Sequence, residues 1–154
     1  MLKPRLNPFE AAASTMKSML DLEHGVRNSG LEHSLIELVK IRTSQINGCA
    51  YCIHMHTKDA RAQGETEERI YLLDAWRESP LYSDRERAAL AWTEALTLVA
   101  QTHAPDEVYE ALTAHFTPEE QVKLTLAIGT INVWNRVAIG FRSIHPYEAG
   151  RAAA

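Results

Sequence analysis

Signals that start and stop helices recur along the whole chain, whereas signals typical of strands are few. Ser83 with Glu86, and Thr117 with Glu120, have the spacing of a capping box, in which both side chains satisfy amide groups at a helix start. The sequence therefore predicts an all-α protein, a helical bundle of about seven helices. The expected helices cover residues 7–25, 31–46, 49–64, 67–77, 83–100, a short segment from 105, and 117–142.

The last of these helices is the least obvious from composition. Residues 125–133 are rich in β-branched side chains, which favour strands. The capped start and the length of the segment instead indicate a buried helix. No repeat, low-complexity segment or linker divides the 154 residues, a length that suits one domain with a real core. We therefore expect residues 1–154 to form a single domain.

Charge and hydropathy exclude two classes of partner. The formal net charge is −4, and acidic and basic residues are interspersed, so there is no basic stripe for a nucleic acid. The first residues lack the apolar segment of a signal peptide, and the most hydrophobic stretch, residues 122–141, is interrupted by polar and charged side chains. We expect a cytoplasmic protein that neither spans a membrane nor binds nucleic acid.

The two cysteines, Cys49 and Cys52, lie three positions apart. A disulfide at that spacing closes almost no loop and so restricts the unfolded chain little. The pair follows the helix stop at Asn47 and Gly48 and stands at the start of the third expected helix. There, unpaired amide groups and the helix dipole favour a thiolate. The pattern favours redox chemistry over a purely structural role.

His56 lies four residues after Cys52, so on a helix the imidazole can accept the thiol proton. If the helices on either side of Gly48 form an antiparallel hairpin, Glu37 lies at about the same depth as His56. A carboxylate at that level would orient the ring and raise its basicity. Glu37, His56 and Cys52 are therefore a candidate proton relay. Position at the helix start favours Cys49 as the attacking sulfur, whereas pairing with His56 favours Cys52.

The pattern Glu37, eleven residues, Cys49-x-x-Cys52, three residues, His56 resembles the core motif of the alkyl hydroperoxidase D (AhpD-like) branch of the carboxymuconolactone decarboxylase family. The resemblance covers about residues 31–64, and more loosely residues 131–137. It implies an all-helical fold that assembles into homo-oligomers, often trimers or hexamers, with peroxidase-like disulfide chemistry. It also implies that Cys52 attacks the hydroperoxide, that Cys49 resolves the product as a disulfide, and that Glu37 and His56 relay protons.

Tyr51 departs from the family pattern, because well-studied members have a histidine directly before the second cysteine. This tyrosine either borders the peroxide pocket or packs against a neighbouring subunit. His54 is two residues from Cys52 and points elsewhere, which is typical of a surface or oligomer-contact histidine. The tryptophans, Trp134 among them, are expected to anchor the core or an interface.

These observations favour a thiol-dependent peroxidase or disulfide reductase that acts on hydroperoxides, needs no bound cofactor, and is restored by a dithiol or lipoyl-type protein reductant. Two other functions stay open: a non-enzymatic redox sensor or binding subunit, and a cofactor-free decarboxylase of a lactone or keto acid that uses His56. The decarboxylase branch of the family generally lacks the cysteine pair. A closed zinc site has four ligands and the motif supplies three, so we expect no metal.

Overall fold

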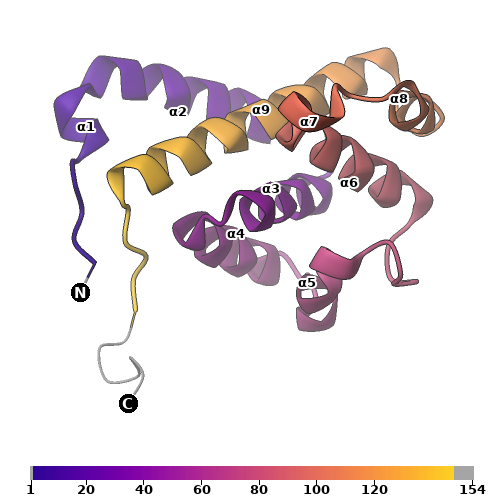
Figure 1. The fold of residues 1–154 in the computed structure, drawn as a ribbon, viewed down its shortest axis with the longest axis horizontal. Helices are drawn as coiled ribbons and strands as arrows, with labels where there is room; N and C mark the ends of the chain where they lie inside the picture. The colour runs from indigo at the N-terminus through magenta and orange to yellow at the C-terminus, as the bar shows by residue number, and fades with distance from the viewer. Residues whose placement is uncertain (1, 148–154) are drawn as a thin grey trace.

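A computed structural model describes residues 2–147, and within this range every regular element is a helix (Figure 1). The elements are α1 (Pro8–Ala11), α2 (Ala13–Arg27), α3 (His33–Asn47), α4 (Ala50–Ala62), α5 (Glu67–Leu72), the 3₁₀ turn η1 (Leu73–Ala75), α6 (Asp84–Thr97), α7 (Val99–Thr102), α8 (Asp106–Thr113) and α9 (Pro118–Phe141).

The predicted all-α fold is confirmed, but the helices are more numerous than the seven expected. Residues 2–147 contain nine α-helices and one 3₁₀ turn, because segments expected to be continuous are divided. Ala12 has φ −145° and ψ 56°, which separates α1 from α2. Leu98, with φ −102° and ψ 30°, separates α6 from α7. The cysteine pair therefore stands at the start of the fourth helix rather than the third.

Both capping boxes predicted from the sequence are present. The Ser83 hydroxyl accepts from the Glu86 amide at the start of α6, and the Thr117 hydroxyl accepts from the Glu120 amide at the start of α9. In each case the glutamate side chain bonds back to the amide of the capping residue. Because its start is fixed in this way, the β-branched stretch of α9 is helical throughout, as predicted.

The central element is α3, which packs against α4, α6 and α9 (Figure 1). Apart from the partly buried Ile46 near its end, its apolar side chains are almost completely buried and belong to two clusters. Leu35, Ile36 and Val39 pack with residues of α6, α8 and α9, while Leu38 and Ile41 pack with residues of α4, α5 and α6. A helix surrounded in this way has no wholly solvated face, so its polar side chains must find partners inside the protein.

The longest helix, α9, runs across the molecule, and the segments before α1 and after α9 both lie near its last turn (Figure 1). The Arg5 amide donates to the Phe141 carbonyl at 3.0 Å, so the segment before α1 lies beside the end of α9. None of the helices in residues 2–147 combines the length and apolar character that crossing a membrane requires.

Candidate active site

The cysteine pair is placed by the turn between α3 and α4. Gly48 adopts a left-handed conformation, with φ 70° and ψ 34°, and its amide bonds back to α3 carbonyls. The Cys49 amide donates to the Ser44 carbonyl at 2.9 Å. Cys49 is then the N-cap of α4, and its sulfur accepts from the Cys52 amide at 3.3 Å. The two sulfurs are joined in a disulfide, and both residues are buried.

His56 follows one turn after Cys52 on α4 and is held by Glu37 of α3. The distance from His56 Nδ1 to Glu37 Oε2 is 2.8 Å, and both residues are at least 97% buried. A carboxylate oxygen accepts, so this bond requires the proton on Nδ1 and leaves Nε2 as the nitrogen that can take a second proton. The hairpin register proposed from the sequence therefore brings Glu37 and His56 together.

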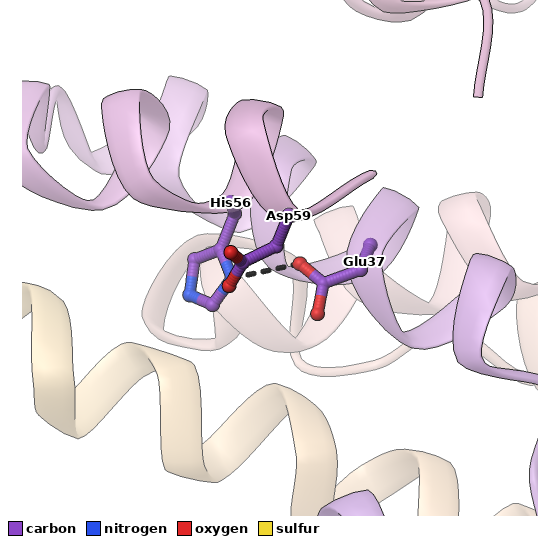
Figure 2. A group of neighbouring side chains, drawn as sticks. All are labelled: Glu37, His56 and Asp59. Carbon is purple, nitrogen blue, oxygen red and sulfur yellow. Dashed lines mark hydrogen bonds and ion pairs between the residues drawn. The ribbon is translucent and has the colours of Figure 1, made fainter. Parts of the chain in front are cut away.

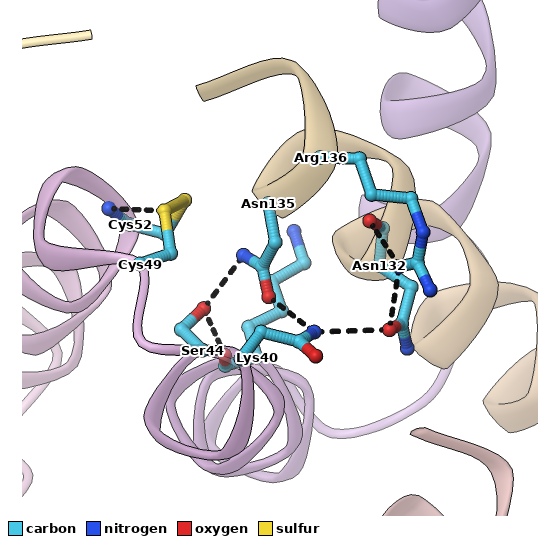
Figure 3. The surroundings of a disulfide bond; sticks show 8 residues. Lys40, Ser44, Cys49, Cys52, Asn132, Asn135 and Arg136 are labelled. Carbon is cyan, nitrogen blue, oxygen red and sulfur yellow. Dashed lines mark hydrogen bonds between the residues drawn. A yellow bond between two sulfur atoms is a disulfide. The ribbon is translucent and has the colours of Figure 1, made fainter. Parts of the chain in front are cut away.

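A row of polar side chains lies under the disulfide, between α3 and α9 (Figure 3). Asn135 donates to the Ser44 hydroxyl at 3.0 Å, and that hydroxyl donates to the Lys40 carbonyl at 2.7 Å. Asn47 donates to the side-chain oxygens of Asn135 and Asn132 at 2.9 Å and 3.0 Å. These bonds fix the end of α3, and with it the turn that carries Cys49, against α9.

Cys52 and His56 both line a cavity of about 560 Å³. Its other walls are mostly apolar and come from α1, α2, α4, α9 and the segments next to the two termini; they include Leu6, Phe9, Leu20, Tyr51, Met55, Trp134, Phe141 and Ile144. A cavity of this size accommodates a small organic molecule. Reduced Cys52 would meet such a molecule beside mostly apolar side chains.

Glu23 of α2 is an acidic group in this cavity that sequence reasoning missed. It forms an ion pair with Lys40, a fully buried residue of α3, and accepts from the Trp134 indole at 3.1 Å. Burial raises the pKa of Glu23, but the hydrogen bonds and charges of Lys40 and then Arg27 outweigh burial and hold the pKa below its ordinary value of 4.5. The signal in the sequence was Lys40 itself, a charged residue inside the apolar run 38–41 that requires a partner.

Asp59 is a second acidic residue that the sequence did not indicate. It lies three residues after His56 on α4, and the ligand atoms of Glu37, His56 and Asp59 are all within 4.8 Å of one another (Figure 2). Arg27 of α2 approaches Asp59, with 3.4 Å between Nη2 and Oδ2. The spacing of Asp59 from His56 could have suggested a shared helix face.

Other predicted residues have distinct positions. Tyr51 is half-buried and lines the cavity, which is one of the two roles expected for it. His54 is not among the residues that line the cavity, and it stacks on His145 with 4.8 Å between the ring centroids. Trp134 was expected to be only an anchor, but it also lines the cavity and stacks on Phe9 of α1.

An all-helical fold with a C-x-x-C pair at a helix start, a histidine one turn later and a glutamate on the preceding helix defines the AhpD-like class of proteins. Residues 13–95, more than half of the chain, match the carboxymuconolactone decarboxylase family, and the chain belongs to this family.

Three known proteins illustrate the relationship. The uncharacterised protein YdfG of Bacillus subtilis (strain 168) is 46% identical over 138 residues, which cover 90% of this chain and 94% of YdfG. A crystal structure from Agrobacterium tumefaciens, of a protein of unknown function proposed to be the antioxidant defence protein AhpD, has 52% identity and a TM-score of 0.93, covering 95% of this chain and all of that one. The AhpD core of an uncharacterised peroxidase-related protein from Ralstonia eutropha JMP134 has 18% identity and a TM-score of 0.78 over 90% of this chain and 74% of that one; this likeness shows the shared fold alone.

Proposed function

We propose that this protein is a thiol-dependent peroxidase and disulfide reductase that reduces hydroperoxides through the Cys49–Cys52 pair. The observation that carries the proposal is a redox-bondable cysteine pair whose second member shares a cavity with His56, itself hydrogen-bonded to Glu37. The AhpD antioxidant role proposed for the Agrobacterium relative supports the same activity.

In the proposed oxidative step, the Cys52 thiolate attacks the outer oxygen of the hydroperoxide and the O–O bond breaks. Cys52 becomes a sulfenic acid, and the departing alkoxide takes the proton that His56 had accepted from the Cys52 thiol. Cys49, as its thiolate, then attacks the Cys52 sulfur and water leaves with the thiol proton. Two thiols and one hydroperoxide have given one disulfide, one alcohol and one water.

The assignment of Cys52 as the attacking thiol and Cys49 as the resolving thiol is supported by their positions at the start of α4. Cys52 is one helical turn from His56, whereas Cys49 is the N-cap and its sulfur accepts the Cys52 amide. A dithiol or lipoyl-type protein reductant, which the chain does not encode, would return the disulfide to two thiols by exchange.

We also propose a homo-oligomer, a trimer or hexamer. Its support is an apolar exposed face on α9, where Val122, Leu126 and Val133 fall at helical spacing and are each at least 39% exposed. Light scattering should give three or six times the chain mass of 17.3 kDa. A monomer at micromolar concentration would contradict this part of the proposal.

Steady-state turnover tests the activity. The reduced protein should consume an organic hydroperoxide continuously when a dithiol is supplied, and Cys52→Ser should abolish this consumption. Cys49→Ser should give one round of oxidation that stops at the sulfenic acid of Cys52. Mass spectrometry of residues 43–58, after substoichiometric peroxide, should show the loss of two hydrogens in the wild type only.

A redox sensor remains the second candidate, because Cys49 and Cys52 pack directly on Ile131 and Ala138 of α9, and oxidation would change that contact. A single stoichiometric oxidation without cycling would support the sensor. Decarboxylation of a lactone or keto acid that survives alkylation of both cysteines would instead support a decarboxylase that uses His56.

A further inference from the structure

Two carboxylates converge on one imidazole beside the cysteine pair. Glu37 Oε2 is 2.8 Å from His56 Nδ1, and Asp59 contributes a second carboxylate to the same group, whose ligand atoms all lie within 4.8 Å of one another (Figure 2). Only Nδ1 of the ring points at Glu37, so the ring can donate a single hydrogen bond toward the two carboxylates. A proton on Nδ1 can satisfy one carboxylate well but cannot neutralise two.

The nearby cations do not fully compensate the negative charge of the two carboxylates. Lys40 is committed to Glu23, and Arg27 divides its guanidinium between Glu23 at 3.2 Å and Asp59 at 3.4 Å. The Arg27 contact with Asp59 is long, and 47% of the Arg27 side chain is exposed, so water screens it. The three-residue cluster is therefore only partly compensated by cations.

Imidazole nitrogen and carboxylate oxygen together are the donors that divalent transition metals such as Zn²⁺ prefer. Ligands about 2.0–2.2 Å from a tetrahedral zinc ion lie about 3.3 Å apart. The pair at 2.8 Å would have to open by only a few tenths of an ångström. The helices set the starting arrangement, because His56 and Asp59 share one face of α4 and Glu37 faces them from α3.

The cluster is also accessible from one side. Glu37 and His56 are buried, whereas 40% of the Asp59 side chain is exposed to solvent. An ion could meet Asp59 first and then displace the proton from Nδ1 of His56, with Arg27 moving outward. The fourth position would be left to water, as it is in open zinc sites.

We propose that Glu37, His56 and Asp59 form a binding site for a divalent transition-metal ion, with Zn²⁺ as the probe. The consequence for activity rests on the proposed function. An ion on Nδ1 uses that lone pair, so neutral imidazole then carries its proton on Nε2 and can no longer accept one from Cys52. Metal binding at this site therefore inhibits peroxide reduction reversibly.

Binding is tested on the oxidised, metal-free protein, in which the disulfide removes both sulfurs as ligands. Calorimetric titration with Zn²⁺ should show one site per chain, and Asp59→Asn should weaken its affinity at least tenfold. Asp21→Asn is the matched control, because Asp21 is an exposed acidic residue of α2 paired only with Lys17. Absence of saturable binding, or equal affinity in wild type and Asp59→Asn, would overturn the site.

Inhibition is tested separately in single turnovers of the reduced, desalted protein, without a dithiol that would chelate the metal. Zn²⁺ should slow oxidation of the wild type by a larger factor than that of Asp59→Asn, with each variant compared with its own rate in the absence of metal. Inhibition by the same factor in both variants would assign the effect to metal binding by the thiols, and would overturn the proposed inhibition through this site. Saturable binding that depends on Asp59 in a protein with no peroxidase activity would retain the site and refute the proposed function instead.

Discussion

The chemistry of single residues here depends on which nitrogen of His56 carries the proton. Glu37 accepts from Nδ1 at 2.8 Å, so Nε2 is the nitrogen available to a thiol in the cavity that His56 and Cys52 share. In the proposed function, the glutamate therefore acts on Cys52 through the ring rather than by contact. Its contribution can be measured by removing the charge and keeping the shape.

We predict that Glu37→Gln slows oxidation of Cys52 by about 10–100-fold, the usual effect of losing a carboxylate that orients a histidine. The amide retains the size of the carboxylate but supplies no negative charge to stabilise the imidazolium. Stopped-flow measurement of sulfenic acid formation across pH tests this prediction, because the pH profile should shift as well as the maximum rate. Glu107→Gln, at an exposed position of α8, is the control. An unchanged rate and profile would remove Glu37 from the relay.

The pairing of Glu37 with His56 could be predicted because both lie on helices joined by a turn of known length, so that register follows from helix rise. Glu23 and Asp59 could not be placed in the same way. Their partners, Lys40 and Arg27, lie on other helices, and nothing in a single sequence states the angle at which α2 crosses α3 and α4. The buried Lys40 indicated that an acidic partner was needed, but the sequence did not indicate which residue it would be.

At the scale of elements, helix ends were predicted well wherever a side chain caps the backbone. Ser83 and Thr117 start α6 and α9 as expected, and Gly48 ends α3. The division at Ala12 was not predicted, because alanine favours the helix interior and no breaker stands there. Local propensity therefore does not account for the break between α1 and α2.

Gly48 provides a test of the turn that carries the cysteine pair. Its φ of 70° is unfavourable for any side chain, although a Cβ there would meet no atom within 4 Å. Gly48→Ala should therefore lower the free energy of unfolding by about 1–2 kcal/mol through backbone conformation alone. Gly25→Ala, on the exposed face of α2 and equally free of neighbours, should raise it by about 0.5–1 kcal/mol. Urea unfolding of both variants checks the two signs, and a loss of equal size in both would contradict the conformational explanation.

Glu23 links three helices. Its carboxylate forms an ion pair between α2 and Lys40 of α3, and it also accepts a hydrogen bond from the Trp134 indole of α9. Because the folded pKa of Glu23 is depressed, its contribution to stability is present above the ordinary carboxyl pKa and is lost as the pH falls through the folded value. Lys40→Met removes the buried cation and leaves Glu23 with the half-exposed Arg27 and the Trp134 indole as partners, so it should destabilise the protein by about 3 kcal/mol at pH 7, the lower end of the cost of breaking a buried pair.

The difference between wild type and Lys40→Met should shrink as the solution is acidified, because the wild type then also loses the ion pair. Urea unfolding at a series of pH values measures this difference. The double variant Lys40→Met with Glu23→Gln should recover part of the stability at pH 7, since no buried charge is left without a partner. A difference that stays constant or grows toward low pH would show that Lys40 acts by packing rather than by charge.

At the scale of the whole molecule, the segments before α1 and after α9 line the same cavity. Pro4 and Leu6 from the first segment, and Ser143 and Ile144 from the last, line the space that Cys52 and His56 share. The cysteine motif could be predicted from the sequence, but these cavity walls could not, because residues more than 130 positions apart meet only in the folded chain. Both cysteines are at least 98% buried, and Cys52 is the one of the pair that lines this space.

Arg5 joins the two segments, since its amide and its guanidinium donate to the carbonyls of Phe141 and Gly140, each at 3.0 Å. Two partly exposed hydrogen bonds are worth about 1 kcal/mol together, which corresponds to roughly a fivefold change in the population of an open state. Deleting residues 2–6 should therefore speed reduction of the Cys49–Cys52 disulfide by a small dithiol about fivefold or more. The rate is measured under pseudo-first-order conditions by the appearance of thiols. Arg5→Ala removes the guanidinium hydrogen bond but keeps the lining residues Pro4 and Leu6, so its reduction rate should lie between those of the deletion variant and the wild type. Equal reduction rates in all three proteins would mean that the terminal segments do not limit access to the sulfurs.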